Sequence, residues 1–488
     1  MRRSDVRTTI PFALFAGLLA LSGSPAYAQE ATTVAQSEKS QNAAPATSAP
    51  SEGSPAAPAS EQPSISSSVP ALRDFKQALL DRGFNLQLNY TGEVFGNPTG
   101  GVRQSGIYEN LLEFAIDGDL QRIAGLTGAS FHVNSYQVIG SGLSTCCVFN
   151  QLTISSIEAR ASTWLFEAWF EQKLFADMVS IRIGQLAADS EFLISDLDSF
   201  FLNATFGWPN ILAADLPSSG PNYPLATPGV RLKITPNDQT TLLAAIFNGD
   251  PSGAGFTGLQ EVLDPSGVNF RLRDPPLLIG EVQYKYNQDK NSAGLAGTAK
   301  LGAWYHFGKF NDQFYSTNGV SLANPSSSGV PLTHAGDYGV YGIINQMLWR
   351  LPGDDPRKGV GVFAFVSAAP SDRNAADFYA HGAINFMGLW DKRPDDMFGV
   401  AAAYSPVSPA VSALDAQSAY FAGAALPIRN YEMALEVSYQ APILPGWLIQ
   451  PDFQYIFHPR YGAIDPINPA VGRIRDAAVF GLHTAIKF

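Results

Sequence analysis

The sequence contains only two cysteines, and they are adjacent, at Cys146 and Cys147. A disulfide framework needs cysteines that are separated along the chain, and zinc or redox motifs need the Cys-x-x-Cys spacing. Both classes are therefore excluded, and no metal site is predicted. We expect the pair to lie in a loop, either as two free thiols or joined in a vicinal disulfide.

Positive charge is also scarce in this chain of 488 residues. Lysine and arginine number 31 against 43 aspartates and glutamates, which gives a formal net charge of -12. An acidic balance of this kind argues against nucleic acid or an anionic lipid surface as the partner. We therefore predict no nucleic-acid binding.

Catalytic motifs are missing as well. The six histidines occur without a His-x-x-x-His pair, and the chain has no Gly-x-Ser-x-Gly elbow. Carboxylate pairs such as Asp196 and Asp198 could serve glycoside hydrolysis, but that chemistry needs a defined separation between the two groups, which sequence does not give. The chain is predicted to be no enzyme and to need no cofactor.

The N-terminus has the pattern of a secretory signal. The apolar run at residues 10–23 follows three arginines and ends shortly before Ala26-Tyr27-Ala28, a small-x-small cleavage pattern. A membrane anchor is the competing interpretation, but the run is too short to span a bilayer comfortably. We therefore assign residues 1–28 to a signal peptide, and its removal leaves 28 basic and 42 acidic side chains.

Two short regions separate the signal from the main domain. Residues 29–70 consist mainly of Ala, Ser, Pro, Thr and Gln, a composition that cannot bury enough apolar surface to offset the entropy of ordering. A disordered spacer is predicted there. Next, Leu72, Phe75 and Leu79 recur at helical spacing before Gly83, which predicts a short amphipathic helix over residues 71–83.

From residue 84 to the end at 488, apolar and polar side chains alternate along most segments. The stretch WLFEAWFEQK at 164–173 is typical, because its alternation has the period of a strand and would leave a helix apolar nearly all round. Roughly sixteen such strands can be counted. The clearest apolar faces are Leu86/Leu88/Tyr90, Leu112/Phe114/Ile116, Val179/Ile181/Ile183, Val230/Leu232/Ile234, Val282/Tyr284/Tyr286, Leu301/Ala303/Tyr305, Leu435/Val437/Tyr439 and Ile449/Phe453/Tyr455.

The connections between these strands alternate in length. Short turns (FADM, TPNDQ and APILPG) alternate with long segments, and a soluble sandwich has no reason for this regularity. A transmembrane barrel does, because its periplasmic turns are short, its outer loops are long and its strand number is even. The mean hydropathy near zero fits lipid outside and water inside. The long segments are 139–156, 188–227, 249–276, 309–337, 407–428 and 458–475.

The C-terminus agrees with a barrel. The last segment, FGLHTAIKF, alternates and ends in Phe488. A final strand that ends in phenylalanine resembles the assembly signal of bacterial outer-membrane proteins, so we expect the barrel-assembly machinery of a Gram-negative outer membrane to recognise it. The sequence thus predicts an all-β transmembrane barrel over residues 84–488, with outer-membrane lipid around it and the short helix in the periplasm.

Several ordered blocks resemble the carbohydrate-selective porin (OprB) family. They are GEVFGNPTGG, WLFEAWFEQKL with IRIGQLAADSEF, FGWPNILAADLPSSGPNYPLATPGVRL, EVQYKYN, LGAWYH, DRNAADFYAHGAINFMGLWDKRPDD and IQPDFQYIFHP. The resemblance implies a sixteen-stranded barrel that passes sugars by diffusion across the outer membrane. It does not cover the spacer or the Cys146-Cys147 pair, and GLWDKRPDD departs from the glycine-rich turn expected there.

The alternation assigns faces to the strand at 164–173. Phe166, Ala168 and Phe170 are expected to face lipid, and the residues between them to face a water-filled lumen. A sugar site needs aromatic ring faces together with hydrogen-bond donors and acceptors. Opposed acidic and basic side chains would orient polar neutral solutes in the lumen. The candidate pore-lining residues are Glu167, Trp169, Glu171, Arg182, Asp189, Glu191, Arg231, Lys233 and Trp304.

The segment 188–227 is too long for a passive loop and is rich in aromatic residues and prolines. We expect it to fold inward and narrow the pore, with Asp189 and Glu191 at its entrance. The competing interpretation is a lid packed over the outer mouth. For the protein as a whole, the alternatives are a general diffusion porin, a secreted β-rich sugar-binding protein, or an outer-membrane lipase or protease.

Overall fold

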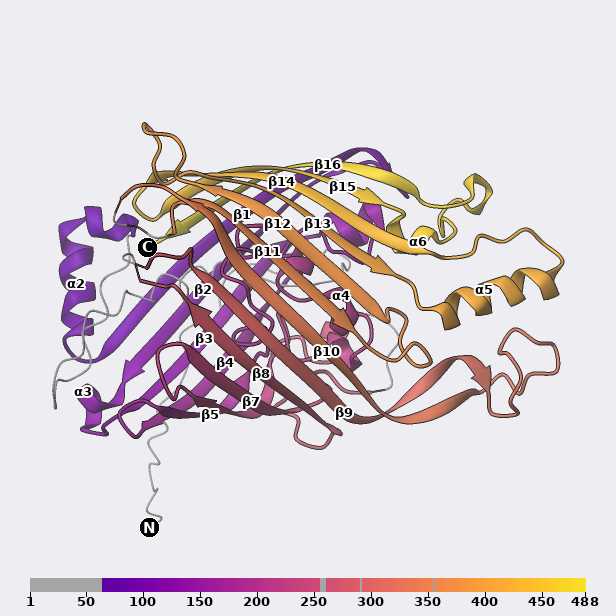
Figure 1. The fold of residues 1–488 in the computed structure, drawn as a ribbon, viewed down its shortest axis with the longest axis horizontal. Coiled ribbons are helices and arrows are strands. Elements are labelled where there is room, and N and C mark those ends of the chain that lie inside the picture. The colour runs from indigo at the N-terminus through magenta and orange to yellow at the C-terminus, as the bar shows by residue number, and fades with distance from the viewer. Residues whose placement is uncertain (1–63, 255–259, 290–291, 354, 356) are drawn as a thin grey trace, which may run out of the picture.

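The computed structural model describes residues 64–254, 260–289, 292–353, 355 and 357–488. These residues form one closed barrel of sixteen antiparallel strands, as the alternation predicted (Figure 1). The predicted signal peptide and nearly all of the predicted spacer lie outside the described residues. The end of the spacer is described, and it contains a short 3-10 helix at Ile65–Ser68.

The strands follow one another around the barrel in chain order, and β1 pairs with β16 to close it. Their bounds are β1 Phe84–Gly101, β2 Gly106–Asp119, β3 Ala129–Gly140, β4 Ser162–Leu174, β5 Val179–Leu186, β6 Thr227–Ile234, β7 Thr240–Asn248, β8 Pro276–Tyr286, β9 Gly297–Ser316, β10 Pro331–Arg350, β11 Gly359–Ala368, β12 Phe378–Met387, β13 Met397–Pro406, β14 Tyr431–Leu444, β15 Trp447–Phe457 and β16 Arg475–Lys487.

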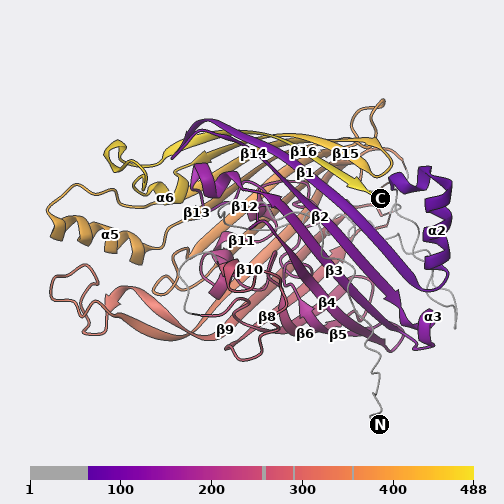
Figure 2. The same ribbon diagram turned by 180° about the vertical axis from the view of Figure 1, so that it is seen from behind.

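The two ends of the barrel differ, as expected. At one end the connections are short, such as 175–178, 235–239 and 445–446. The C-terminus lies at this end, beside the helix α2 (Figure 2). At the other end lie the long connections. Closure leaves no unpaired strand edge in the wall, which satisfies the backbone hydrogen bonds of a sheet surrounded by hydrocarbon.

Helices are few and short. The predicted helix at 71–83 is present as α2, Pro70–Leu80, and Lys76 Nζ donates to Phe488 O at 2.8 Å, which links it to the C-terminus. No helix in the described part of the chain is long and apolar enough to cross a membrane. The remaining α-helices are α3 Leu120–Ala124, α4 Asn210–Ala213, α5 Pro409–Ala422 and α6 Pro459–Gly462.

The outer face of the wall is apolar along most strands, which confirms the predicted parity at β5, β6, β8 and β9. In β9, for example, Leu301 and Tyr305 are exposed on the outside while Trp304 points inward and is buried. On β8, Tyr284 is exposed on the outside as predicted.

The prediction for Phe166 was wrong. Its side chain is buried inside the barrel against Tyr136 and Tyr223, not exposed to lipid. The reason is a β-bulge, because the pairing of β3 with β4 shifts between Val133 and Ser135. A bulge inserts one residue on one strand and reverses the faces on either side of it, so Phe166 and Glu167 both lie inside.

The prediction of a long loop at 309–337 was also wrong. Strands β9 and β10 continue past the wall as a two-stranded ribbon, and only residues 317–330 connect them (Figure 1). We call residues 307–339 the outer hairpin. The expected long connections at 139–156, 188–227, 249–276, 407–428 and 458–475 were correct to within about five residues.

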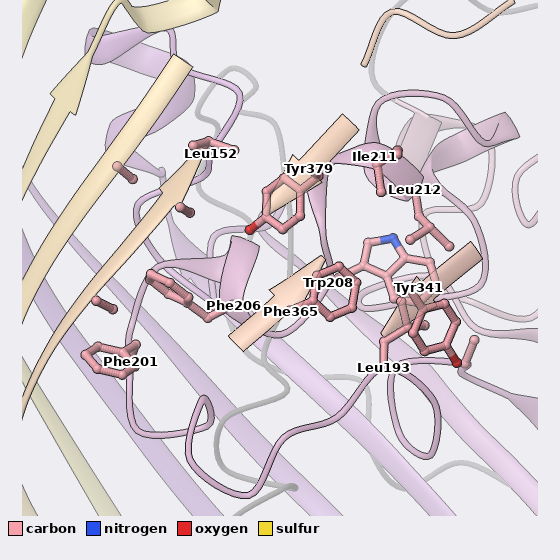
Figure 3. Close-up of a cluster of buried hydrophobic side chains, with 14 of the residues drawn as sticks. Leu152, Leu193, Phe201, Phe206, Trp208, Ile211, Leu212, Tyr341, Phe365 and Tyr379 are labelled. Carbon is pink, nitrogen blue, oxygen red and sulfur yellow. The ribbon is translucent and has the colours of Figure 1, made fainter. Parts of the chain in front are cut away.

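The interior of the barrel is filled by chain rather than left open throughout. A cluster of buried apolar side chains joins the wall to the connections that fold inward (Figure 3). Phe201 and Phe206 come from the connection between β5 and β6, and their rings contact Phe363 of the wall. Trp208 of the same connection belongs to the same cluster, together with Tyr341 and Phe365 of the wall. This packing positions the candidate site.

Candidate solute constriction

The connection between β5 and β6, residues 187–226, folds into the barrel as predicted, so the alternative of an outer lid is excluded. We call it the inner belt. It touches the wall in turn at Glu281 of β8, Asn385 of β12 and Glu436 of β14, before it returns to β6. The belt therefore passes across the lumen and narrows it.

Wall side chains supply the hydrogen bonds that the belt backbone lacks. Glu436 accepts hydrogen bonds from Leu202 N at 2.7 Å and Asn203 N at 2.9 Å. Gln450 Nε2 donates to Phe200 O at 2.8 Å. Because the belt has little regular secondary structure, these side chains replace the partners that a helix or a sheet would provide.

The connection at 141–161 also folds inward and meets the belt. Glu432 of β14 accepts hydrogen bonds from Gln151 N and Leu152 N, and Ala204 N of the belt donates to Thr153 O at 2.9 Å. This connection carries the adjacent cysteines, which form a vicinal disulfide. The sequence had left open whether they were free thiols or bonded. No group of three potential metal ligands occurs in the described ranges.

Where the belt leaves β5, four charged side chains form a closed set of ion pairs. Arg182 lies 3.0 Å from Glu171 and 2.8 Å from Glu191, and Arg231 lies 3.2 Å from Glu171 and 2.5 Å from Glu191. Each arginine thus bridges both glutamates. We call these four residues the charge ring. Ser180 extends it, because Arg231 Nη1 donates to Ser180 Oγ at 2.6 Å.

Strand register explains why the ring forms. Glu171 of β4 is directly opposite Arg182 of β5, which is opposite Arg231 of β6, so three of the four residues share one row on the inner face. The belt then supplies Glu191 from above this row. The side chains in the ring are only 3% to 14% exposed, so charge pairing here is stronger than at an open surface.

Trp169 lies next to the ring, but both sides of its indole are covered. The Arg182 guanidinium carbon lies 3.6 Å from the centre of the ring system. On the β3 side, His132 stacks on the indole with 5.1 Å between ring centroids and 21° between the planes. Strands β3 and β5 flank β4 on opposite sides, so no broad face of Trp169 is left for a solute.

The nine predicted pore-lining residues therefore divide into two sets. The structure brings Glu171, Arg182, Glu191 and Arg231 together, with Trp169 against them. Lys233 also lies on the inner face of β6, two residues beyond Arg231 and partly exposed.

The other three predicted residues lie outside the charge ring. Glu167 is buried and accepts a hydrogen bond from Ala187 N at 3.0 Å, so it anchors the belt. Asp189 is fully buried and accepts from Tyr223 N within the belt. Trp304 is 3% exposed in the apolar cluster and stacks on Tyr341. The inward parity of Glu167 and Trp304 was predicted correctly, whereas Asp189 lies in the belt, where strand alternation assigns no face. Sequence periodicity does not reveal that Glu167 bonds to the belt.

Sequence reasoning also missed three residues around the ring. Ser180 alternates with Arg182 on β5, and this alternation could have identified it. Asp117 and His132 lie on β2 and β3, and their proximity to Trp169 depends on the register across three strands. A single sequence carries no signal for that register.

Comparisons with known proteins agree with this architecture. The family model described as "Carbohydrate-selective porin, OprB family" matches residues 103–488. Porin B of Pseudomonas aeruginosa is 23% identical over 424 residues, which covers 82% of this chain and 88% of that protein. The putative porin QuiX of Acinetobacter baylyi is 21% identical over 432 residues, covering 85% and 91% of the two chains.

A solved structure gives the same fold. The high-pH structure of Pseudomonas putida OprB superposes with a TM-score of 0.73 at 22% identity, and the match covers 85% of this chain and 96% of that chain. The family match begins at Arg103, so the block GEVFGNPTGG at 92–101 lies before it.

Proposed function

The chain belongs to the OprB family of carbohydrate-selective porins, and we propose that its charge ring is the point where small sugars, monosaccharides among them, are selected as they diffuse through the barrel. The protein is an outer-membrane porin of a Gram-negative bacterium, a channel rather than an enzyme. A secreted sugar-binding protein is therefore excluded. The observation that supports the ring as the selective point is the pairing of two arginines with two glutamates beside the inner belt.

The chemistry of the ring suits a neutral polyol. Each sugar hydroxyl can donate one hydrogen bond and accept two, and the ring offers both carboxylate acceptors and guanidinium donors within a few ångströms. The ring carries no net charge, because two positive side chains pair with two negative ones. A small ion meets no fixed excess of either sign there, whereas a sugar can exchange hydrogen bonds with both.

Recognition by hydroxyl edges replaces the stacking that the sequence suggested. Trp169 is covered by Arg182 and His132, and Trp304 is buried in the apolar cluster. We therefore propose that Trp169 acts through Arg182 instead of contacting the sugar face, and that Trp304 has no direct part.

Binding at the ring must be weak for transport to occur. A conducting site has to release its solute, so we expect millimolar affinity, about -4 kcal/mol. Passage should therefore saturate at high sugar concentration without tight capture.

The test compares arginine loss in the ring with the loss of a lumen cation elsewhere. Arg231→Ala is matched by Lys285→Ala, since Lys285 lies on the inner face of β8, outside the ring. Planar-bilayer recordings with glucose, a disaccharide and an amino acid of similar size would give the sugar block of ion current. We expect Arg231→Ala alone to weaken the glucose block about tenfold. Liposome swelling would check transport.

Equal rates for glucose and the amino acid, unchanged by Arg231→Ala, would leave a general diffusion porin as the correct interpretation.

We also propose that residues 1–28 are a cleaved signal, that residues 29–63 are a spacer dispensable for conduction, and that Phe488 is recognised by the barrel-assembly machinery. A spacer deletion that assembles but fails to conduct would contradict the second of these.

A further inference from the structure

A row of side chains runs across the inner wall toward the charge ring. Asn85 of β1, Asp117 of β2, His132 of β3 and Trp169 of β4 are successive cross-strand partners, and the next position on β5 is Gly184. Directly opposite residues in neighbouring strands bring their side chains into contact. The row therefore gives a continuous path of contacts from the barrel seam to the ring.

Each contact along the row is short and directional. His132 Nδ1 lies 2.7 Å from Asp117 Oδ1, and the second oxygen, Asp117 Oδ2, accepts from Asn85 Nδ2 at 3.2 Å and from Gln87 Nε2 at 2.7 Å. A carboxylate held by three neighbours fixes the plane of the imidazole, as carboxylates do for histidines that act as ligands. The imidazole then stacks on Trp169.

The absence of a side chain at Gly184 explains why Arg182 can contact the indole of Trp169 on the side away from His132. Gly184 has φ +149, and a Cβ there would lie 2.6 Å from Trp169 Cα. Only glycine fits this backbone and this contact. Since Gly184 has no side chain, the space beside Trp169 on β5 is open to the guanidinium of Arg182, two residues earlier, which lies 3.6 Å from the indole centre.

The indole provides a π face and no hydrogen bond. In the described part of the chain, no acceptor lies within reach of the buried Trp169 Nε1. Its contribution is thus the attraction between an aromatic face and a cation, which grows when the pair is shielded from water. The orientation of that face depends on what supports it from the other side, and His132 is that support.

We propose that Asp117 and His132 are positioning residues, which hold Trp169 as a platform for Arg182 and thereby fix the cation that recognises sugar hydroxyls in the charge ring. This inference rests on the proposed function of the ring. Neither residue touches the ring itself. They act through Trp169, as the outer supports of a binding site orient the groups that contact a ligand.

The experiment is a double-mutant cycle on sugar block in planar bilayers. His132→Ala removes the stacking partner, and we expect it to weaken glucose block about three- to tenfold while small-ion conductance changes much less. His132→Phe keeps a ring against Trp169 and should restore block to within about twofold. His334→Ala, in the outer hairpin, is the matched control for loss of a histidine.

The decisive measurement is the effect of His132→Ala in an Arg182→Ala background. If His132 acts through Arg182, its loss should cause no further weakening once Arg182 is absent. The same fold-loss in both backgrounds, or wild-type block in His132→Ala, would overturn the inference. If His132→Ala fails to assemble, His132→Gln is carried through the same cycle.

Failure of the proposed function has a different signature. If Arg182→Ala alone leaves sugar block unchanged, the charge ring is not the selective point, whatever His132→Ala does. If Arg182→Ala weakens block but leaves it measurable, and His132→Ala causes the same further fold-loss in that background as in the wild type, the ring stands and only the positioning role is wrong.

Discussion

The inner belt and the outer hairpin leave the same end of the barrel, but the belt turns into the lumen and the hairpin projects away from the wall (Figure 1). Both were predicted from sequence as long loops. The hairpin satisfies most of its backbone with its own ladder, in which Thr333 pairs with Asn311 and His334 with Phe310, and Gln313 N donates to Asp372 O outside it at 2.7 Å. The belt has no such ladder, and its backbone bonds to Glu436, Gln450 and other wall side chains.

The belt and the hairpin obtain their stability from different contacts. Phe192, Phe206 and Trp208 of the belt are buried in the apolar cluster, whereas Tyr315 and Val330 of the hairpin are about half exposed. A buried backbone without partners is costly, so the wall must carry inward-facing acceptors and amides wherever the belt passes. An exposed ribbon needs only its own ladder and water.

The largest expected effect follows from removing the belt. Replacing residues 190–223 by a short Gly/Ser linker removes Glu191 and opens the lumen. We expect single-channel conductance to rise several-fold and saturable sugar block to disappear, because the charge ring loses one of its four members. Planar-bilayer recording measures both. Unchanged conductance in an assembled barrel would show that the belt does not limit the pore.

A smaller effect is expected when one anchor of the belt is weakened. Glu436→Gln replaces one accepting oxygen by an NH2 group, so Leu202 N or Asn203 N loses its acceptor while buried. We expect a loss of about 1–3 kcal/mol in belt docking. Limited proteolysis of the belt and thermal unfolding followed by gel mobility would detect it. Val437→Ala, on the outer face of the same strand, is the control and should have no such effect.

The connection at 141–161 gives a pH-dependent test of inward docking. Burial raises the pKa of Glu158 to about 7, although Thr145 N and Thr145 Oγ1 donate hydrogen bonds to its carboxylate. Because the pKa of Glu158 is higher in the docked state than in the undocked state, the protonated carboxyl stabilises docking. This stabilisation is fully present below the ordinary pKa of a glutamate and is lost as the pH rises through about 7.

Protease sensitivity of this connection should therefore increase as the pH rises from about 5 to about 8. Glu158→Gln keeps the size of the side chain and cannot ionise, so the increase should flatten in that variant. A pH profile identical to that of the wild type would assign the effect to another group.

The smallest effect is expected at the outer hairpin. Removing residues 314–331 and joining the strands with Asn-Gly leaves the wall ladder and the charge ring in place. Because the hairpin is stabilised locally, assembly, conductance and sugar block should all stay close to those of the wild type. A large fall in sugar block would mean that the hairpin contributes to the pore and that the contrast with the belt is false.

Much of the fold could be predicted because strand alternation is a local property. A period of two along the chain assigns inward and outward faces without any knowledge of neighbours, and it was correct at Tyr284, Trp304 and Arg182. It failed at Phe166, where a bulge reverses the faces. A bulge adds a single residue and leaves no mark in an alternating sequence that can be separated from ordinary variation.

The candidate site was predicted less completely, because a side chain that faces inward does not necessarily meet the charge ring. Glu171, Arg182, Glu191 and Arg231 were named from sequence and do meet. Glu167, Asp189 and Trp304 were also named as pore-lining, and they lie outside the ring. Only the path of the belt separates the two groups, and that path is set by contacts between residues that lie far apart in the chain.

The class of protein and the inward and outward faces of most strands follow from the sequence, since composition, alternation and connection lengths are local properties of the chain. Only the folded barrel shows that a belt crosses the lumen, that Trp169 is covered on both sides, and that Asp117 and His132 support Trp169 beside the charge ring. These features depend on register across several strands and on which buried backbone groups find partners. Both are fixed only when the barrel closes, because the strand register and the hydrogen bonds between the inward connections and the wall then form together.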